Sequence, residues 1–169
     1  MTSITASMVK ELRERTGLGM MDCKKALSEA SGDMEKAIED LRKASGLKAA
    51  KKASRVAAEG VVMAKVSGDG NRGVILEVNS ETDFVAKNSS FIELANSILM
   101  IALKHECADL DSIKSLDLDG SMSVHDKLVE QTGVIGEKLA ISAFERVEAN
   151  YVGSYTHGVK IAVLIGLNN

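Results

Sequence analysis

The spacing of apolar residues changes at Gly60, and this change divides the chain into two kinds of structure. Before Gly60, apolar residues recur three and four positions apart, which is the period of helices that bury one side. After it, VVMAKV at 61–66 and GVILEV at 73–78 are short apolar runs joined by turn-forming residues, a pattern typical of a β-hairpin. The sequence therefore predicts an α+β fold, with a helical part followed by an antiparallel sheet and packed helices.

Residues 1–46 are expected to form three short helices. Thr5 is a candidate N-cap of the first helix, and the third helix is expected to start at Asp33. The second helix follows Asp22, and the third is expected to end near Gly46. The chain contains no proline, which would interrupt such helices, and its small core indicates a compact three-helix module.

A basic segment follows at 42–55, where RKASGLKAAKKASR carries six cations and no acid. We interpret residues 47–59 as a basic linker. Two interpretations of its charge stay open. It is either a solvated helical connector or a patch for RNA or an acidic partner, and an RNA-binding module acting through this linker is the alternative function.

Residues 60–138 are expected to form a first core half, in which the hairpin packs against a long helix that ends near His105. An acidic, irregular stretch at 108–120 and a shorter helix ended by the glycines at 133–136 complete it. Residues 139–169 are expected to begin a second, incomplete half with two strands on either side of 151–158. No helix covers the last strand, which indicates an exposed sheet face and a longer architecture.

The connector at 79–88, NSETDFVAKN, carries an aromatic residue in an otherwise polar loop. Loops lie on the surface because their backbone groups need water, so Phe84 would be displayed there, and displayed aromatic residues bind partners. The spacing alone leaves two interpretations open: Phe84 is displayed to a partner, or it folds back into the core.

Composition and spacing argue against several other classes of function. Cys23 and Cys107 lie outside any CxxC spacing, and the GxGxxG match at 68–73 leads into a strand rather than a helix, so we expect no metal site and no cofactor. Ser154 and His157 lack the context of a nucleophile, and we expect no catalytic residues and no enzyme activity. With no membrane-spanning or signal segment, the chain is expected to be cytoplasmic. A net charge of −3 argues against general nucleic-acid binding.

Five motifs resemble the bacterial elongation factor Ts family, the guanine-nucleotide exchange factors of elongation factor Tu. They occur in the family's order, at 9–27, 48–54, 79–88, 135–137 and 153–158: VKELRERTGLGMMDCKKAL, KAAKKAS, NSETDFVAKN, IGE and GSYTHG. The resemblance implies a ubiquitin-associated-like bundle at the N-terminus and a core of two related halves. It also implies that a full-length factor would be longer than this chain.

The resemblance further implies two sets of residues that contact elongation factor Tu, in its GDP-bound and nucleotide-free forms. Those of the N-terminal module are Arg13, Met20 and Met21; from spacing alone, the two methionines are as readily core residues of the bundle. Those of the core are Thr82, Asp83, Phe84, Ile135, Gly136 and His157. Asp83 and Phe84 match the pair that the family places beside the magnesium site of its partner. No membrane and no specific nucleic acid is expected as a partner.

Overall fold

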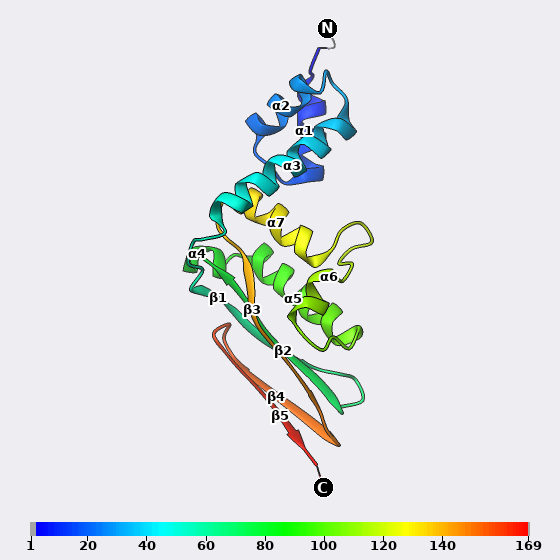
Figure 1. Ribbon diagram of the computed structural model, residues 1–169, viewed down its shortest axis with the longest axis vertical. Coiled ribbons are helices and arrows are strands. Elements are labelled where there is room, and N and C mark those ends of the chain that lie inside the picture. The colour runs from blue at the N-terminus through cyan, green and yellow to red at the C-terminus, as the bar shows by residue number, and fades with distance from the viewer. Residues whose placement is uncertain (1–2, 169) are drawn as a thin grey trace. The chain divides into compact units, whose positions relative to one another are not determined.

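The computed structural model describes residues 3–168 and confirms the α+β class. The chain divides into two compact units (Figure 1). The helical unit contains Met1–Ser54 and Val129–Gly136, and the sheet unit contains Arg55–Leu128 and Glu137–Asn169. Residues 129–136 thus belong with the helical unit, although they lie within the range predicted for the first core half.

The helical unit is built from α1 (Ala6–Thr16), α2 (Met20–Glu29) and α3 (Met34–Lys52). The predicted N-cap of α1 is confirmed, because Thr5 Oγ1 accepts a hydrogen bond from the amide of Met8. The third helix begins as predicted beside Asp33, which is its N-cap and accepts a hydrogen bond from the amide of Lys36. The three helices enclose a small core centred on Leu12, Cys23, Leu27, Ala37 and Leu41.

The end predicted for the third helix was wrong. Instead of stopping near Gly46, α3 continues to Lys52, so it includes most of the basic segment. A lone glycine costs a helix only about 1 kcal/mol, and the alanines and lysines that follow Gly46 favour helix strongly enough to offset that cost.

The helix α7 (Val124–Ile135) was also predicted to end too early, because Gly133 lies within it. A Cβ at Gly133 would lie 2.7 Å from Ser45 Oγ, so the missing side chain lets the end of α7 approach α3 closely. Val134 packs beside the core of the bundle, and Gly136, with a φ of 84°, follows the helix.

The sheet unit is organised around β2 (Arg72–Ser80), which pairs antiparallel with β1 (Glu59–Val66) on one side and with β3 (Ala140–Glu148) on the other. The predicted hairpin is confirmed, with Val61 opposite Val78. Because side chains alternate along a strand, Val74, Leu76 and Val78 share one buried face.

That face is covered by α5 (Ser89–Lys104), which buries one side formed by Phe91, Leu94, Ala95, Ile98, Leu99 and Ala102. Its predicted end near His105 is confirmed. The stretch predicted to be irregular contains the short helix α6 (Leu110–Ser115), capped by the Asp109 carboxylate. The buried Ile113 explains why this acidic segment is ordered.

The opposite face of the sheet is covered by a two-stranded ribbon, β4 (Tyr151–His157) paired with β5 (Ile161–Leu167) (Figure 1). A Cβ on Gly73 would lie 2.6 Å from Leu164 Cδ1 and 2.9 Å from Val152 Cγ1, so the ribbon packs closely on β2. We expected residues 151–158 to connect two strands. They form a strand themselves, because pairing with β5 satisfies their backbone groups.

Replacing Gly60 by Ala should unfold the sheet unit at much lower temperature. Gly60 has a φ of 149°, and a Cβ there would lie 2.1 Å from the carbonyl oxygen of Val78. We expect a loss of about 3 kcal/mol in the free energy of unfolding. For the control, Gly68→Ala, no described atom lies within 4 Å of the new Cβ, and the change should stay within about 0.5 kcal/mol. Equal unfolding curves for the two variants would contradict this account.

Candidate functional site

The connector at 79–88, which carries Phe84, contains one turn of helix, α4 (Asp83–Ala86), shortly after the end of β2. Phe84 is 83% exposed, whereas Ala86 at the end of the same turn is buried. The open question about Phe84 is therefore resolved in favour of display. We call Thr82, Asp83 and Phe84 the α4 tip.

The α4 tip is anchored by hydrogen bonds to Ser80 and Glu137. Ser80, fully buried, donates from its hydroxyl to the carbonyl oxygen of Thr82 at 2.9 Å. The Glu137 carboxylate accepts from the amides of Glu81 and Thr82, at 3.1 and 3.0 Å, and from the Thr82 hydroxyl at 2.6 Å. The tip thus presents an exposed aromatic ring on a fixed backbone.

Asp83 forms an ion pair with Lys87, one helical turn further on, at 2.6 Å. The hydrogen bond from Lys87 lowers the pKa of Asp83, and the charge of Lys87 and, more weakly, of Lys160 lowers it further. The same contact raises the pKa of Lys87. Asp83 is therefore held as a carboxylate beside the exposed ring of Phe84.

His157 lies at the same end of the sheet unit as the α4 tip, next to the turn between β4 and β5. Two contacts hold this turn against β1: the amide of Val62 donates to the carbonyl oxygen of Val159 at 2.8 Å, and Lys160 pairs with Glu59. His157 is exposed and stands opposite Ile161 in the ribbon. The sheet unit thus brings together four of the predicted site residues, which are Thr82, Asp83, Phe84 and His157.

The remaining predicted site residues belong to the helical unit. Met20 and Met21 begin α2 rather than standing in the turn before it, and they are 50% and 75% exposed, so they are not core residues of the bundle. Arg13 is exposed on α1. Ile135 ends α7 and is half-buried, and Gly136 follows it.

Two residues at the site were missed by reasoning from the sequence. Glu137 contacts residues 55 and 56 positions earlier in the chain, and Lys160 pairs with a residue 101 positions earlier. Glu137 belongs to the IGE motif, which marked its segment but not its partner. No local pattern marks Lys160, because its contact depends on how the ribbon packs on β1.

The alternative chemistries find no geometric support among the residues that the structure describes. Ser154 and His157 are three positions apart on β4, so strand alternation places their side chains on opposite faces. Burial raises the pKa of the Cys107 thiol, which disfavours a reactive thiolate. Within residues 3–168, no group of three or more His, Cys, Asp or Glu side chains could hold a metal ion.

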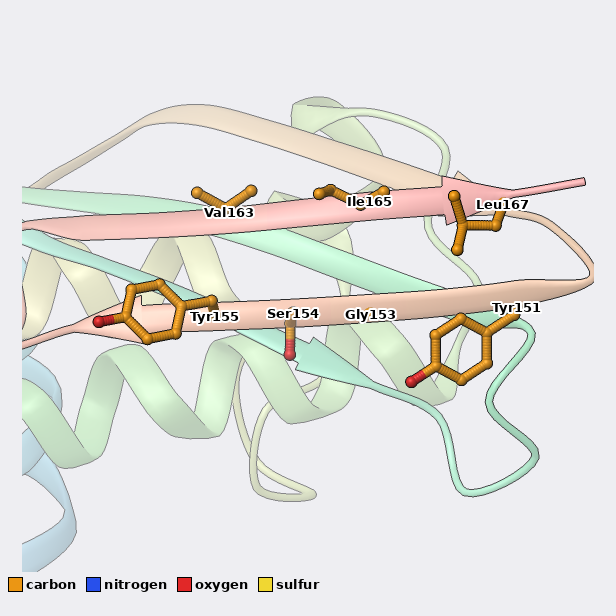
Figure 2. A pocket seen from close by; sticks show the side chains of 7 residues that line it. All are labelled: Tyr151, Gly153, Ser154, Tyr155, Val163, Ile165 and Leu167. Atoms are coloured by element: carbon orange, nitrogen blue, oxygen red, sulfur yellow. The ribbon is translucent and has the colours of Figure 1, made fainter.

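The outer face of the ribbon carries a shallow apolar groove (Figure 2). It is lined by Tyr151, Gly153, Ser154, Tyr155, Val163, Ile165 and Leu167. Apart from the Ser154 hydroxyl, its side chains are aromatic and aliphatic. In the part of the chain that is described, no helix has the length and apolar character needed to span a bilayer.

Together these features define an α+β protein that displays an aromatic residue and a carboxylate from one end of its sheet. The family model described as Elongation factor TS matches residues 81–169, which is more than half of the chain. The chain belongs to the Elongation factor TS family.

Curated relatives named Elongation factor Ts agree with this assignment. The protein of Christiangramia forsetii is 54% identical over 169 residues, covering 99% of this chain and 61% of the relative. Those of Hahella chejuensis and Rhodopirellula baltica are 51% and 49% identical, with 57% and 50% of the relative covered. The chain therefore spans about half to three-fifths of the length of these relatives.

Replacing Lys87 by Met should raise the pKa of Asp83 toward that of an ordinary aspartate. The reason is that the hydrogen bond from Lys87 lowers the pKa of Asp83 more than any other interaction does. A lowered pKa means that the pair contributes to stability above the ordinary aspartate pKa. That contribution is lost as the pH falls through the lowered value. NMR titration of the Asp83 carboxyl carbon measures the change directly.

Two further lysine variants serve as comparisons for the change in the pKa of Asp83. Lys160→Met should give a smaller rise in the pKa of Asp83, because Lys160 acts only through its charge. Lys65→Met, on β1, should give none. An Asp83 titration that is the same in the wild-type and Lys87→Met proteins would refute the ion pair.

Proposed function

We propose that this chain binds elongation factor Tu and promotes release of GDP by disturbing its magnesium and phosphate site. Membership of the Elongation factor TS family supports this proposal. The observation that carries it is the exposure of Phe84 on a turn anchored to the sheet. An exposed aromatic ring on a fixed support loses little entropy on binding, which favours insertion into a partner.

The physical basis of exchange is the strict geometry of magnesium. Magnesium requires near-ideal octahedral coordination and neutralises the phosphate oxygens of the nucleotide, so a small displacement of its supporting groups weakens GDP strongly. In this proposal Phe84 supplies the apolar insertion. Asp83, held as a carboxylate, hydrogen-bonds groups exposed by the displacement or competes for them electrostatically. No covalent chemistry is required.

Linkage makes the binding of nucleotide and the binding of the exchange factor mutually antagonistic. A factor that lowers the affinity of its partner for nucleotide must itself bind more weakly once nucleotide rebinds. We therefore propose tight binding to the nucleotide-free form and weaker binding to the GDP-bound form. His157 of the sheet unit, and Ile135 and Gly136 at the end of α7 in the helical unit, are proposed as further contacts on the strength of the family resemblance.

The helical unit is proposed to supply a second contact through Met20, Met21 and Arg13. The two thioethers are exposed at the start of α2, and flexible, polarisable methionine side chains suit a contact surface. The basic residues of the linker are not proposed as an RNA site. Lys48 pairs with Asp22 at 3.5 Å and Arg55 with Glu81 at 3.3 Å, so part of this charge is already neutralised within the chain.

Replacing Phe84 by Ala should reduce stimulated GDP release from elongation factor Tu much more than it reduces complex formation with the nucleotide-free form. Labelled GDP measures the first and titration calorimetry the second. We expect a rate loss of about tenfold or more, where each factor of ten corresponds to about 1.4 kcal/mol. Because Phe84 is exposed, thermal stability should hardly change, whereas truncating a buried Phe costs about 3–5 kcal/mol.

The matched control for this experiment is Tyr151→Ala, which removes an exposed aromatic ring from the same unit. Tyr151 stands opposite Leu167, at the far end of the ribbon from His157 and the turn beside β1. This variant should stimulate GDP release as the wild-type protein does. A Phe84→Ala protein that is folded and exchanges normally would exclude the proposed role of the α4 tip.

The double change of Met20 and Met21 to Ala should weaken binding to nucleotide-free elongation factor Tu by about tenfold. The midpoint of thermal unfolding should stay within about 3 °C, because both side chains are exposed. Leu47→Ala, which truncates an exposed aliphatic side chain on α3, is the control and should bind normally. Loss of thermal stability with unchanged affinity would assign the methionines to the bundle instead.

A further inference from the structure

We infer that Glu137 is a positioning residue for the α4 tip: its carboxylate fixes the backbone from which Phe84 and Asp83 reach the partner. This inference rests on the proposed function of the tip. Glu137 itself is half-buried, and its carboxylate contacts residues 81 and 82 of the connector. It acts through Thr82 and Glu81 rather than by contact with the partner.

The Glu137 carboxylate accepts three hydrogen bonds from residues 81 and 82. Oε2 accepts from both amides, and Oε1 accepts from the Thr82 hydroxyl. Hydrogen bonds to an ionised acceptor are roughly twice as strong as those between neutral groups. Three of them on two successive residues fix the direction in which the chain enters α4.

Thr82 occupies the N-cap position of α4, with φ −123° and ψ 157°. An N-cap threonine ordinarily accepts from an amide of its own helix. Here the hydroxyl instead donates to Glu137, 55 positions further along the chain. The start of α4 is thereby tied to another segment of the sheet unit rather than to the helix it begins.

A helix of four residues has no stability of its own, so the orientation of α4 depends on what holds its two ends. Its end is held by the burial of Ala86. Its start is held by Glu137 and by the bond from the Ser80 hydroxyl to Thr82. Phe84 stands between these two anchors and is exposed, so contacts of its own ring contribute little to fixing it.

The Glu137 segment is in turn held by the connector. Glu81 Oε1 accepts from the amide of Lys138 at 2.7 Å, and the ammonium of Lys138 donates to the carbonyl oxygen of Arg55 at 2.9 Å. Arg55 pairs with Glu81 at 3.3 Å. The carboxylate of each segment therefore accepts backbone hydrogen bonds from the other segment, which links the Glu137 segment to the connector in both directions.

Loss of this anchor should affect exchange more than folding. Catalytic groups lose about a hundredfold in rate when they are misplaced by about 1 Å, and a looser α4 would displace Phe84 on that scale. The core of the sheet unit, formed by β2 and α5, does not include Glu137, and water can replace a half-exposed acceptor. The anchor thus governs the geometry of the tip.

The test compares Glu137→Ala with Glu137→Gln in the full chain. Glutamine keeps one oxygen for the two amides, and the Thr82 hydroxyl can accept from its amide nitrogen, so the geometry survives without the charge. We expect Glu137→Ala to lower stimulated GDP release by about tenfold or more and Glu137→Gln to restore most of the rate. Binding to nucleotide-free elongation factor Tu should change by less than about threefold. Glu145→Ala, on β3, is the matched control and should behave as wild type.

Hydrogen exchange in the free protein provides a readout that does not depend on the partner. The amide protons of Glu81 and Thr82 should exchange faster in Glu137→Ala than in the wild-type protein, while amides within β2 keep their protection. Unchanged protection of these two amides would overturn the inference even if GDP release fell. Normal GDP release by Glu137→Ala, beside a defective Phe84→Ala, would overturn it and leave the proposed function intact.

If Glu137→Ala does not fold, Thr82→Val tests the same contact by removing only the hydroxyl donor. It should lower GDP release less than Phe84→Ala does. When Glu137→Ala does fold, the effects of the two changes in the double variant should be less than additive, because they break one shared contact. Strict additivity would count against the anchor. Normal exchange by both Phe84→Ala and Glu137→Ala would instead reject the proposed function itself.

Discussion

The sheet unit depends on the burial of β2 from both sides. Val74, Leu76 and Val78 face α5, and Gly73 on the other face receives Leu164 of the ribbon at close range. At roughly 25 cal/mol per Å² of apolar surface, burial on this scale is the main favourable term in folding the unit. Because β2 is the central strand and runs directly into α4, its position also decides where the α4 tip emerges.

Polar contacts that begin at the end of β2 hold the α4 tip in position. Ser80, the last residue of β2, holds the carbonyl oxygen of Thr82, and Glu137 holds the amide and hydroxyl of the same residue. Lys87 then keeps Asp83 ionised beside Phe84. A rigid apolar core thus supports a small polar scaffold, and the scaffold presents one exposed ring.

The sequence predicted those elements whose signals are local. Thr5 and Asp33 mark helix starts because a side-chain oxygen next to a free amide needs no distant partner. The long helix α5 and the hairpin β1–β2 follow from apolar periodicity and turn residues within a few positions of one another. The connector at 79–88 was likewise recognised from ten consecutive residues, which also gave the position of Phe84 in the sequence.

What the tertiary structure alone decided rests on contacts between distant residues. Residues 151–157 form a strand because β5 pairs with them. The helix α7 continues through Gly133, where the missing side chain allows close packing against Ser45 of α3. The exposure of Phe84 could be established only from the folded structure, because its spacing in the sequence fitted an exposed ring and a buried ring equally well. The same holds for the contact between Thr82 and Glu137, since no local sequence pattern links these two positions. Sequence determined which residues stand at the α4 tip, and the folded chain determined that they are displayed and held.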